Sequence, residues 1–201
     1  MALINEIIPV QGFEVVLNKI ASILLIEVSN QISIQGITDV VEVYTERMAP
    51  FDKSEDVIIN VSCNSANYEN MNQRDVQAST DYFIDVYTRG FDDNVEDGEE
   101  NSRHKLHRYI GMCRYILSSV KYKTLGFDMS LRLVGGSYVN SINFDDNYGN
   151  QDAAYVRMAR LTLSVRVQEN QQMDDVVEFL GNDTTTKLSN TDKGQKLIFN
   201  T

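Results

Sequence analysis

The sequence YVRMARLTLSVRV, at residues 155–167, alternates apolar and polar side chains over most of its length. Every second residue from Ala159 to Val167 is apolar, and Arg160, Thr162 and Arg166 are among the polar residues between them. A period of two turns one set toward a core and the other toward solvent. The segment is therefore predicted to be a long β-strand with one buried face.

Three stretches upstream show related signals. Residues 40–44 are rich in apolar side chains, residues 57–63 alternate, and residues 78–88 alternate around Tyr82 and Ile84. The last two stretches are predicted to form an antiparallel hairpin. Their connection, residues 64–77, is polar and rich in asparagine. Because loops longer than about 12 residues are commonly functional or mobile, we expect this one to be a contact arm.

A further strand region is predicted between residues 131 and 144. Leu131 and Leu133 fall at odd positions, whereas Ile142 and Phe144 fall at even ones, and Gly135-Gly136 lies between the two pairs. A β-bulge inserts one extra residue and so changes the face on which later side chains lie. The glycines are therefore predicted to form such a bulge.

Two helices are predicted from a different period. Apolar residues recur at helical spacing over residues 13–29, and after a brief alternation from Ile32 the pattern ends at Gly36. A second helix is expected from about Ser102 to Tyr122, with its apolar residues on an arc of about 120° at 100° per residue. The residues of that arc are Leu106, Tyr109, Ile110, Cys113, Ile116, Leu117 and Val120.

Together these elements predict an α+β fold in the order α-β-β-β-α-β-β. About five strands form an antiparallel or mixed sheet, and the two main helices pack on one face of it. Residues 1–169 are expected to form a single domain, which is large enough to bury its own core. Residues 170–201 are expected to be a polar C-terminal extension or arm, either anchored on an adjacent subunit by its short apolar groups or frayed.

Composition limits the classes of function. The 201 residues carry a net charge of −11, and the sequence pI is about 4.6, which argues against an electrostatic grip on nucleic acid. No stretch approaches the roughly 18 apolar residues of a membrane span, and no signal-peptide pattern is present. We therefore expect synthesis in the cytoplasm, where Cys63 and Cys113 are buried thiols rather than a disulfide.

Acidic and basic residues meet at one place in the chain. Residues 1–100 contain 5 Lys and Arg against 19 Asp and Glu, whereas residues 101–201 contain 13 against 10. The boundary is sharpest where an acidic run precedes the second helix. We expect the acidic run of one copy to meet the basic helix of a neighbouring copy in a head-to-tail contact. The residues of this predicted interface are Asp92, Asp93, Glu96, Asp97, Glu99, Glu100, Arg103, His107, Arg114 and Lys121.

Part of this arrangement has a simpler explanation. Acidic residues at the start of a helix and basic residues at its end complement the helix dipole by roughly a few tenths of a kcal/mol each. Glu99, Glu100 and Lys121 fit that explanation. Arg114 in mid-helix and the acidic residues upstream do not, so the segment 92–97 with Arg114 and His107 remains the central part of the predicted interface.

The sequence holds no recognised catalytic, metal or cofactor signature. His104 and His107 lack a nearby third ligand, residues 145–150 lack the order of a calcium loop, and Gly135-Gly136-Ser137 lacks the rest of a phosphate-binding motif. There is no Gly-x-Ser-x-Gly elbow, and Cys113 lies on the core arc. We therefore expect no enzyme activity, cofactor or metal; an unrecognised carboxylate site is the alternative.

Several sequence patterns follow one another in a distinctive order along the chain. They are VEVYTER at 41–47, IINV at 58–61, DYFIDVY at 81–87, the helix at 103–120 and the closing strand RLTLSV at 160–165. This order resembles that of the tail terminator proteins of tailed bacteriophages, over about residues 13–169. The resemblance implies an α+β subunit of a ring, commonly a hexamer, between tail tube and capsid neck. Related neck rings with twelve copies also fit.

The expected function is thus that of a structural virion protein, which forms a homo-oligomeric ring at the head–tail junction as a tail terminator or a neck or tail-completion protein. Its partners would be its own copies, in a hexameric or dodecameric ring, and other neck, connector or tail proteins. No membrane and no specific nucleic-acid binding are expected, with DNA passing through the lumen. The long strand at 155–167 is expected to offer an edge for sheet continuation. The alternative is a small docking module of a contractile tail or baseplate-like apparatus.

Overall fold

The computed structural model describes residues 7, 8, 10–48, 55–70, 76–91, 97–128, 133–145, 155–169, 189–191 and 194–196. The chain divides into two units, Met1–Asn170 and Gln171–Thr201. The elements of the first unit are α1 (Gly12–Gln35), β1 (Val41–Thr45), β2 (Val57–Asn70), β3 (Val76–Gly90), α2 (Gly98–Ser118), η1 (Val120–Tyr122), β4 (Val134–Asp145) and β5 (Tyr155–Gln168).

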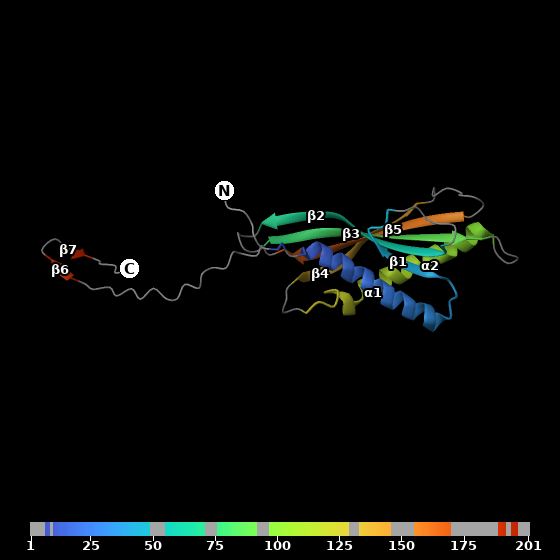
Figure 1. The fold of residues 1–201 in the computed structure, drawn as a ribbon, viewed down its shortest axis with the longest axis horizontal. Coiled ribbons are helices and arrows are strands. Elements are labelled where there is room, and N and C mark those ends of the chain that lie inside the picture. The colour runs from blue at the N-terminus through green and yellow to red at the C-terminus, as the bar shows by residue number, and fades with distance from the viewer. Residues whose placement is uncertain are drawn as a thin grey trace. The chain divides into compact units, whose positions relative to one another are not determined.

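The first unit is a five-stranded sheet with both α-helices on one face (Figure 1). The strands lie in the order β1-β2-β3-β5-β4. β1 is parallel to β2, and every other neighbouring pair is antiparallel. The predicted α+β fold and its element order are therefore confirmed. β5 lies between β3 and β4, so the expectation that residues 155–167 offer a free edge is wrong; the edges are β1 and β4.

One continuous core lies between the sheet and the helices. The apolar positions of β5, from Ala159 to Val167, are all buried, as their alternation predicts. Tyr82 of β3 is also fully buried, and its hydroxyl donates a hydrogen bond to the Phe13 carbonyl at 2.9 Å. Burying one large apolar side chain stabilises a fold by roughly 1.5–3 kcal/mol. Interior packing of this kind fixes which face of the sheet the helices cover.

Helix α1 is longer than its apolar repeat suggests. It continues through residues 32–35, where the sequence shows a brief alternation, and ends at Gly36 with a φ of 64°. The Ile37 N–H donates to the Ile32 carbonyl at 3.1 Å, a bond typical of a Schellman ending. Glycine adopts this left-handed conformation without the steric penalty of a side chain.

The start of α1 is capped from the far end of the unit. The Glu169 carboxylate accepts hydrogen bonds from the Gly12 and Phe13 N–H groups at 2.9 and 2.8 Å. The first N–H groups of a helix have no partner within the helix, and a negative charge near them is favourable. A residue that directly follows β5 therefore caps the N-terminus of α1.

Helix α2 begins four residues before the predicted start and ends at Ser118 rather than at Tyr122. Ser119 has an extended backbone, with a ψ of 140°, and the short 3-10 helix η1 follows. Six residues of the predicted apolar arc are buried, but Val120 is 90% exposed. Val120 does not belong to the core, because the helix ends before it.

The long polar loop predicted at residues 64–77 is not present. β2 continues to Asn70 and β3 begins at Val76, with pairing from Val57 opposite Thr88 to Asn70 opposite Val76. The register shifts once, between Cys63 and Ser65. Side chains 64–69 are half-buried or exposed, so no apolar alternation marks this part of the strand, and backbone pairing holds the hairpin. The residues left for a turn, 71–75, lie outside the described residues.

The predicted bulge at the two glycines is present. The register of β4 against β5 shifts between Val134 and Gly136, and again between Val139 and Ser141. The φ of Gly136 is 143°, a value that glycine adopts most readily. A Cβ at Gly135 would lie 3.2 Å from the Cδ of Arg166, so the absence of a side chain gives Arg166 room beside β4. Leu131 lies outside the described residues.

The second unit contains the strands β6 (Ser189–Thr191) and β7 (Gly194–Lys196), which pair antiparallel to each other. Within the described part of the chain, neither α1 nor α2 combines the length and hydropathy that crossing a membrane requires.

Candidate subunit interface

The acidic half of the predicted interface is described only in part. Asp92, Asp93 and Glu96 lie outside the described residues. Asp97 directly precedes α2, and its side chain accepts a hydrogen bond from the Glu99 N–H at 3.4 Å. Asp97 is therefore the N-cap of the helix, a local role that satisfies one of its first N–H groups.

Glu99 and Glu100 have cationic partners on the same chain. The Glu99 carboxylate lies 2.7 Å from Nη2 of Arg157 in β5. The Glu100 carboxylate lies 3.3 Å from Nη2 of Arg103 and 3.8 Å from Nε2 of His104. Exposed pairs of this kind contribute about 0–1 kcal/mol. Three residues of the predicted interface, Glu99, Glu100 and Arg103, thus have partners within their own chain.

Lys121 also has a partner on the same chain. Its ammonium group lies 2.7 Å from the carboxylate of Glu27 in α1, and the Tyr122 hydroxyl donates to the same carboxylate. The hydrogen bond to Glu27 raises the pKa of Lys121. The hydrogen bonds from Lys121 and Tyr122 lower the pKa of Glu27. Lys121 therefore ties the segment after α2 to α1.

His107 and Arg114 have different surroundings. The His107 ring stacks on Phe144 near the end of β4, with ring centroids 5.1 Å apart. Arg114 is exposed and has no ion pair or hydrogen bond to a described side chain. It lines a groove of about 520 Å³ between α2 and β4, together with Lys123 and Tyr138. Arg114 is thus a cation of the predicted interface that still faces an open groove.

The two edges of the sheet differ in length. β1 pairs with β2 only from Val57 to Val61, whereas β2 continues to Asn70. Within the described ranges, the stretch from Ser62 to Asn70 has β3 on one side and no strand on the other. Unpaired strand edges present N–H and C=O groups to any chain that can pair with them. This distal part of β2 is therefore an open edge.

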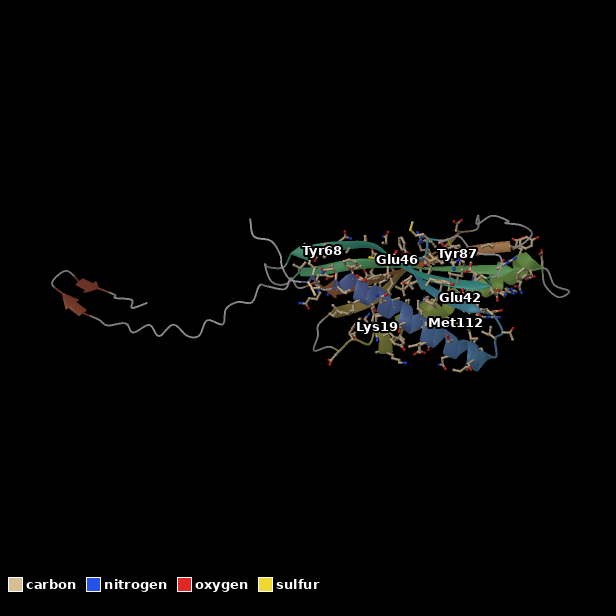
Figure 2. The ribbon with its side chains drawn as sticks, in the orientation of Figure 1. Lys19, Glu42, Glu46, Tyr68, Tyr87 and Met112 are labelled. Atoms are coloured by element: carbon tan, nitrogen blue, oxygen red, sulfur yellow. The ribbon has the colours of Figure 1, made fainter. Side chains whose placement is uncertain are left out.

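Acidic side chains lie on the same side of the sheet as that open edge. Glu42 of β1, Glu46 just after it and Glu69 of β2 are all exposed, and Figure 2 labels the first two together with Tyr68. The Glu46 carboxylate accepts a hydrogen bond from the Cys63 N–H at 2.7 Å, which covers one backbone group of the edge. We call Glu42, Glu46 and Glu69, with β1 and residues 62–70 of β2, the acidic edge.

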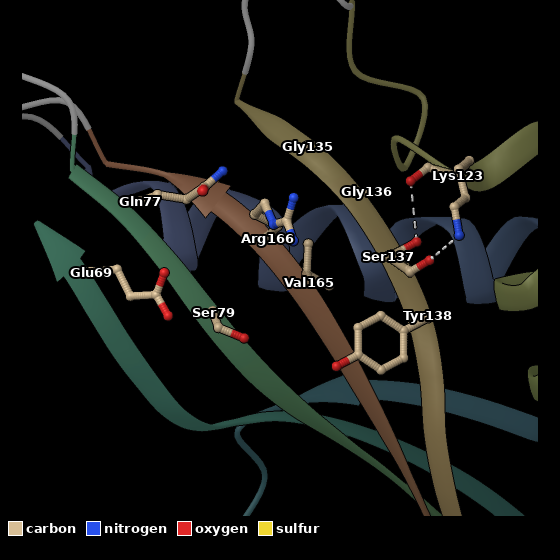
Figure 3. A pocket seen from close by; sticks show the side chains of 10 residues that line it. All are labelled: Glu69, Gln77, Ser79, Lys123, Gly135, Gly136, Ser137, Tyr138, Val165 and Arg166. Carbon is tan, nitrogen blue, oxygen red and sulfur yellow. Dashed lines mark hydrogen bonds between the residues drawn. The ribbon is translucent and has the colours of Figure 1, made fainter. Parts of the chain in front are cut away.

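Basic side chains gather around the other edge of the sheet. Lys123 approaches β4 from the side opposite β5, and its ammonium donates to the Ser137 carbonyl at 2.8 Å (Figure 3). Arg166 is exposed and lies against Gly135. We call Arg114, Lys123 and Arg166, with β4, the basic edge.

The surface next to Arg166 is hollowed. Arg166, Ser79 and Tyr138 line a hollow of about 310 Å³ across β3, β5 and β4, with Glu69 of β2 at its other end (Figure 3). Its walls are mostly polar side chains and the Gly135-Gly136 backbone. The hollow is therefore better suited to polar or charged groups than to an apolar ligand.

A charged cluster that the sequence did not indicate joins α2 to the starts of β1 and β2. The Lys105 ammonium lies 2.7 Å from Asp56 and 3.5 Å from Asp39. The Tyr109 hydroxyl donates to Asp39 at 2.8 Å, and Arg108 lies 3.5 Å from the same carboxylate. Burial, with the hydrogen bond to Asp39, raises the pKa of Tyr109. Because each group here has a partner of opposite charge or a hydrogen bond, the cluster serves to hold the elements together.

Cys113, His104 and His107 each contact neighbouring side chains of the fold. Cys113 is fully buried, and burial raises its pKa to about 12, so the thiol stays protonated and a poor nucleophile. His104 contacts Glu100 and His107 stacks on Phe144. In the parts of the chain that the structure describes, no group of three His, Cys, Asp or Glu residues is placed to hold a metal ion.

No protein-family model and no curated protein sequence matches the chain. The resemblance to tail terminator proteins therefore rests on the sequence patterns quoted above and on the order of the elements. The order of the elements is the part that the structure confirms.

Proposed function

We propose that the chain is a structural virion protein of a tailed bacteriophage, which forms a homo-oligomeric ring at the head–tail junction as a tail terminator or as a neck or tail-completion protein. Its partners are then its own copies, in a hexameric or dodecameric ring, and the neck, connector or tail proteins that the ring joins. A net charge of −11 would limit sticking of DNA that passes through the lumen.

The observation that carries the proposal is the open edge of β2 from Ser62 to Asn70. An exposed edge of this length favours pairing with another chain. The sheet ends at β4 on its other side, so one copy offers two different edges. Contacts between two different patches join copies head to tail, and such contacts close into a ring when the rotation between neighbours allows it.

A second candidate function is that of a small docking module in a contractile tail or baseplate-like apparatus. It is favoured by a groove of about 420 Å³ between α1 and α2, lined by Gln31, Met112 and Tyr115 among others. Tyr115 is 79% exposed, and exposed aromatic residues are enriched where proteins bind one another. Such a module would bind one larger partner without forming a ring.

Size-exclusion chromatography with light scattering separates these functions. We expect the purified chain to form one closed oligomer, of six or twelve copies, as its concentration rises at low ionic strength. A chain that stays monomeric at every concentration contradicts the ring. A stable one-to-one complex with a larger tail component, formed by a chain that does not self-associate, supports the docking module instead.

A further inference from the structure

We infer that the acidic edge of one copy pairs with the basic edge of a second copy of the chain. The inference rests on the proposed function, because it names the two surfaces that meet in the ring. Arg114 belongs to the interface predicted from the sequence and also to this one, but here its partners are the carboxylates beside β1 and β2.

The acidic edge carries a charge that its surroundings do not balance. Glu42, Glu46 and Glu69 are exposed. The nearby cation Arg47 is bound by both carboxylate oxygens of Glu55, at 2.5 and 2.9 Å. A bidentate pair of this kind is geometrically specific and holds the guanidinium in place. Glu42 accepts a hydrogen bond from the Tyr44 hydroxyl at 2.6 Å, and Glu69 lines the same hollow as Arg166. No described cation forms an ion pair with Glu42, Glu46 or Glu69, so their negative charges remain available to cations from outside the chain.

The basic edge has the complementary property. Arg114 and Arg166 are exposed, and no described side chain forms an ion pair with either. Lys123 uses its ammonium on a backbone carbonyl of β4 and so keeps its positive charge at the edge. Asp145, the last residue of β4, is the acidic residue within that strand. The three cations near β4 are thus complementary in charge to the three carboxylates near β1 and β2.

The location of the charges selects the kind of assembly. β1 and the distal part of β2 lie on one side of the sheet and β4 on the other, with Arg166 on the neighbouring inner strand β5. Two copies that met through the same edge would therefore bring like charges together. Like charges across an interface cost several kcal/mol and exclude wrong partners. The charge pattern therefore favours head-to-tail association over a symmetric pair of identical edges.

The strand directions allow the two edges to pair. From β2 to β3, β5 and β4 each neighbour reverses direction, so β4 runs opposite to β2 in the same sheet. If copies are related by rotation about an axis along the strands, β4 of one copy is antiparallel to the open part of β2 in the next. Antiparallel pairing is the commoner and slightly more stable arrangement. The bulges of β4, the bond from Lys123 to the Ser137 carbonyl and the Glu46 cap on β2 limit the pairing to part of each edge.

Two charge-reversal variants test the pairing. Glu42→Lys with Glu69→Lys makes both edges basic, and Arg114→Glu with Arg166→Glu makes both edges acidic. Glu46 and Lys123 stay unchanged, because each bonds a backbone group of a strand. In light scattering at low ionic strength, we expect each variant alone to associate at least tenfold more weakly than the wild-type chain. An equimolar mixture should assemble again, with the two variants in alternation.

The controls separate this inference from the proposed function. Arg103→Glu reverses another exposed arginine of α2 and should leave assembly unchanged, and urea unfolding of every variant shows that it is folded. A wild-type oligomer that neither double variant weakens overturns the edge pairing and leaves the ring standing. Failure of the mixture to reassemble, while each folded variant alone is monomeric, also overturns the pairing. A wild-type chain that never associates overturns the ring and the edge pairing together.

Discussion

Arg89 of β3 is a buried cation, and its guanidinium is only partly satisfied by the described residues. It is 8% exposed, and its guanidinium lies 4.3 Å from the centre of the Phe91 ring. The neighbouring Thr88 hydroxyl donates to the Ser102 carbonyl of α2, so the alternation of β3 places Arg89 on the face away from the helices. Among the described residues, Nε and Nη1 of Arg89 have no hydrogen-bond partner. A buried polar group without a partner costs about 1–3 kcal/mol.

We therefore predict that Arg89→Met stabilises the fold, by roughly 1–2 kcal/mol in the free energy of unfolding measured in urea. Methionine has a similar length, keeps an apolar contact with Phe91 and needs no hydrogen bond. A variant that is less stable than the wild-type chain would show that the guanidinium is satisfied in solution.

Arg160→Met is the matched comparison for that change. Arg160 binds both carboxylate oxygens of Asp85, at 2.7 and 2.8 Å, and Asp85 is 3% exposed. Removing this arginine leaves a buried carboxylate without its counterion, which costs about 3 kcal/mol or more. The two arginine-to-methionine substitutions should therefore change stability in opposite directions, and equal effects would contradict the structural reason given for each.

The contact between β3 and α2 depends on the absence of a side chain at Gly90. A Cβ there would lie 1.9 Å from the Gly98 carbonyl oxygen and 2.7 Å from the Ser102 nitrogen, both backbone atoms of α2. We predict that Gly90→Ala lowers the free energy of unfolding by roughly 3 kcal/mol or more, because strand and helix must move apart. Gly111→Ala is the control, since nothing lies within 4 Å of that site; alanine there should raise stability by about 0.5–1 kcal/mol. A Gly90→Ala variant as stable as the wild-type chain contradicts the close contact.

The sequence predicts an element well where one face of it meets the core. The β5 alternation and six of the seven residues in the α2 arc match buried positions, because solvent and core impose their own periods on side chains. The distal β2 strand could not be found in this way. Its side chains are half-buried or exposed, and backbone pairing with β3, which leaves no mark in the pattern, holds it in place.

The candidate interface was predictable only where its charges are local in the sequence. Asp97 and Glu100 act within α2, as helix-end complementarity suggests. The partners of Glu99 and Lys121 come from β5 and α1, 58 and 94 residues away. The sheet topology decides which charges meet, and the spacing of residues in the sequence does not contain that information. For the same reason the sequence did not indicate the ion pair between Lys105 and Asp56.

At the scale of the molecule, the first unit contains a hydrophobic core, and its last described residue contacts its first helix. Among the described residues, every member of the core cluster precedes Gln168, and Glu169 reaches back to cap α1. The division of the chain after Asn170 falls directly behind that cap. The described core and the cap of α1 therefore both lie within the first unit.

A chain that ends at Asn170 should consequently unfold at the same urea concentration as the full chain, within about 0.5 kcal/mol in the free energy of unfolding, as expected for a change away from the core. In that shortened chain, Glu169→Ala should cost about 1 kcal/mol, because the Gly12 and Phe13 N–H groups lose their acceptors. The comparison separates two roles for the end of the chain. If removal of residues 171–201 alone lowers stability by more than the Glu169 substitution does, the second unit contributes to the fold of the first. If it leaves stability unchanged but weakens self-association in light scattering, the second unit acts between copies.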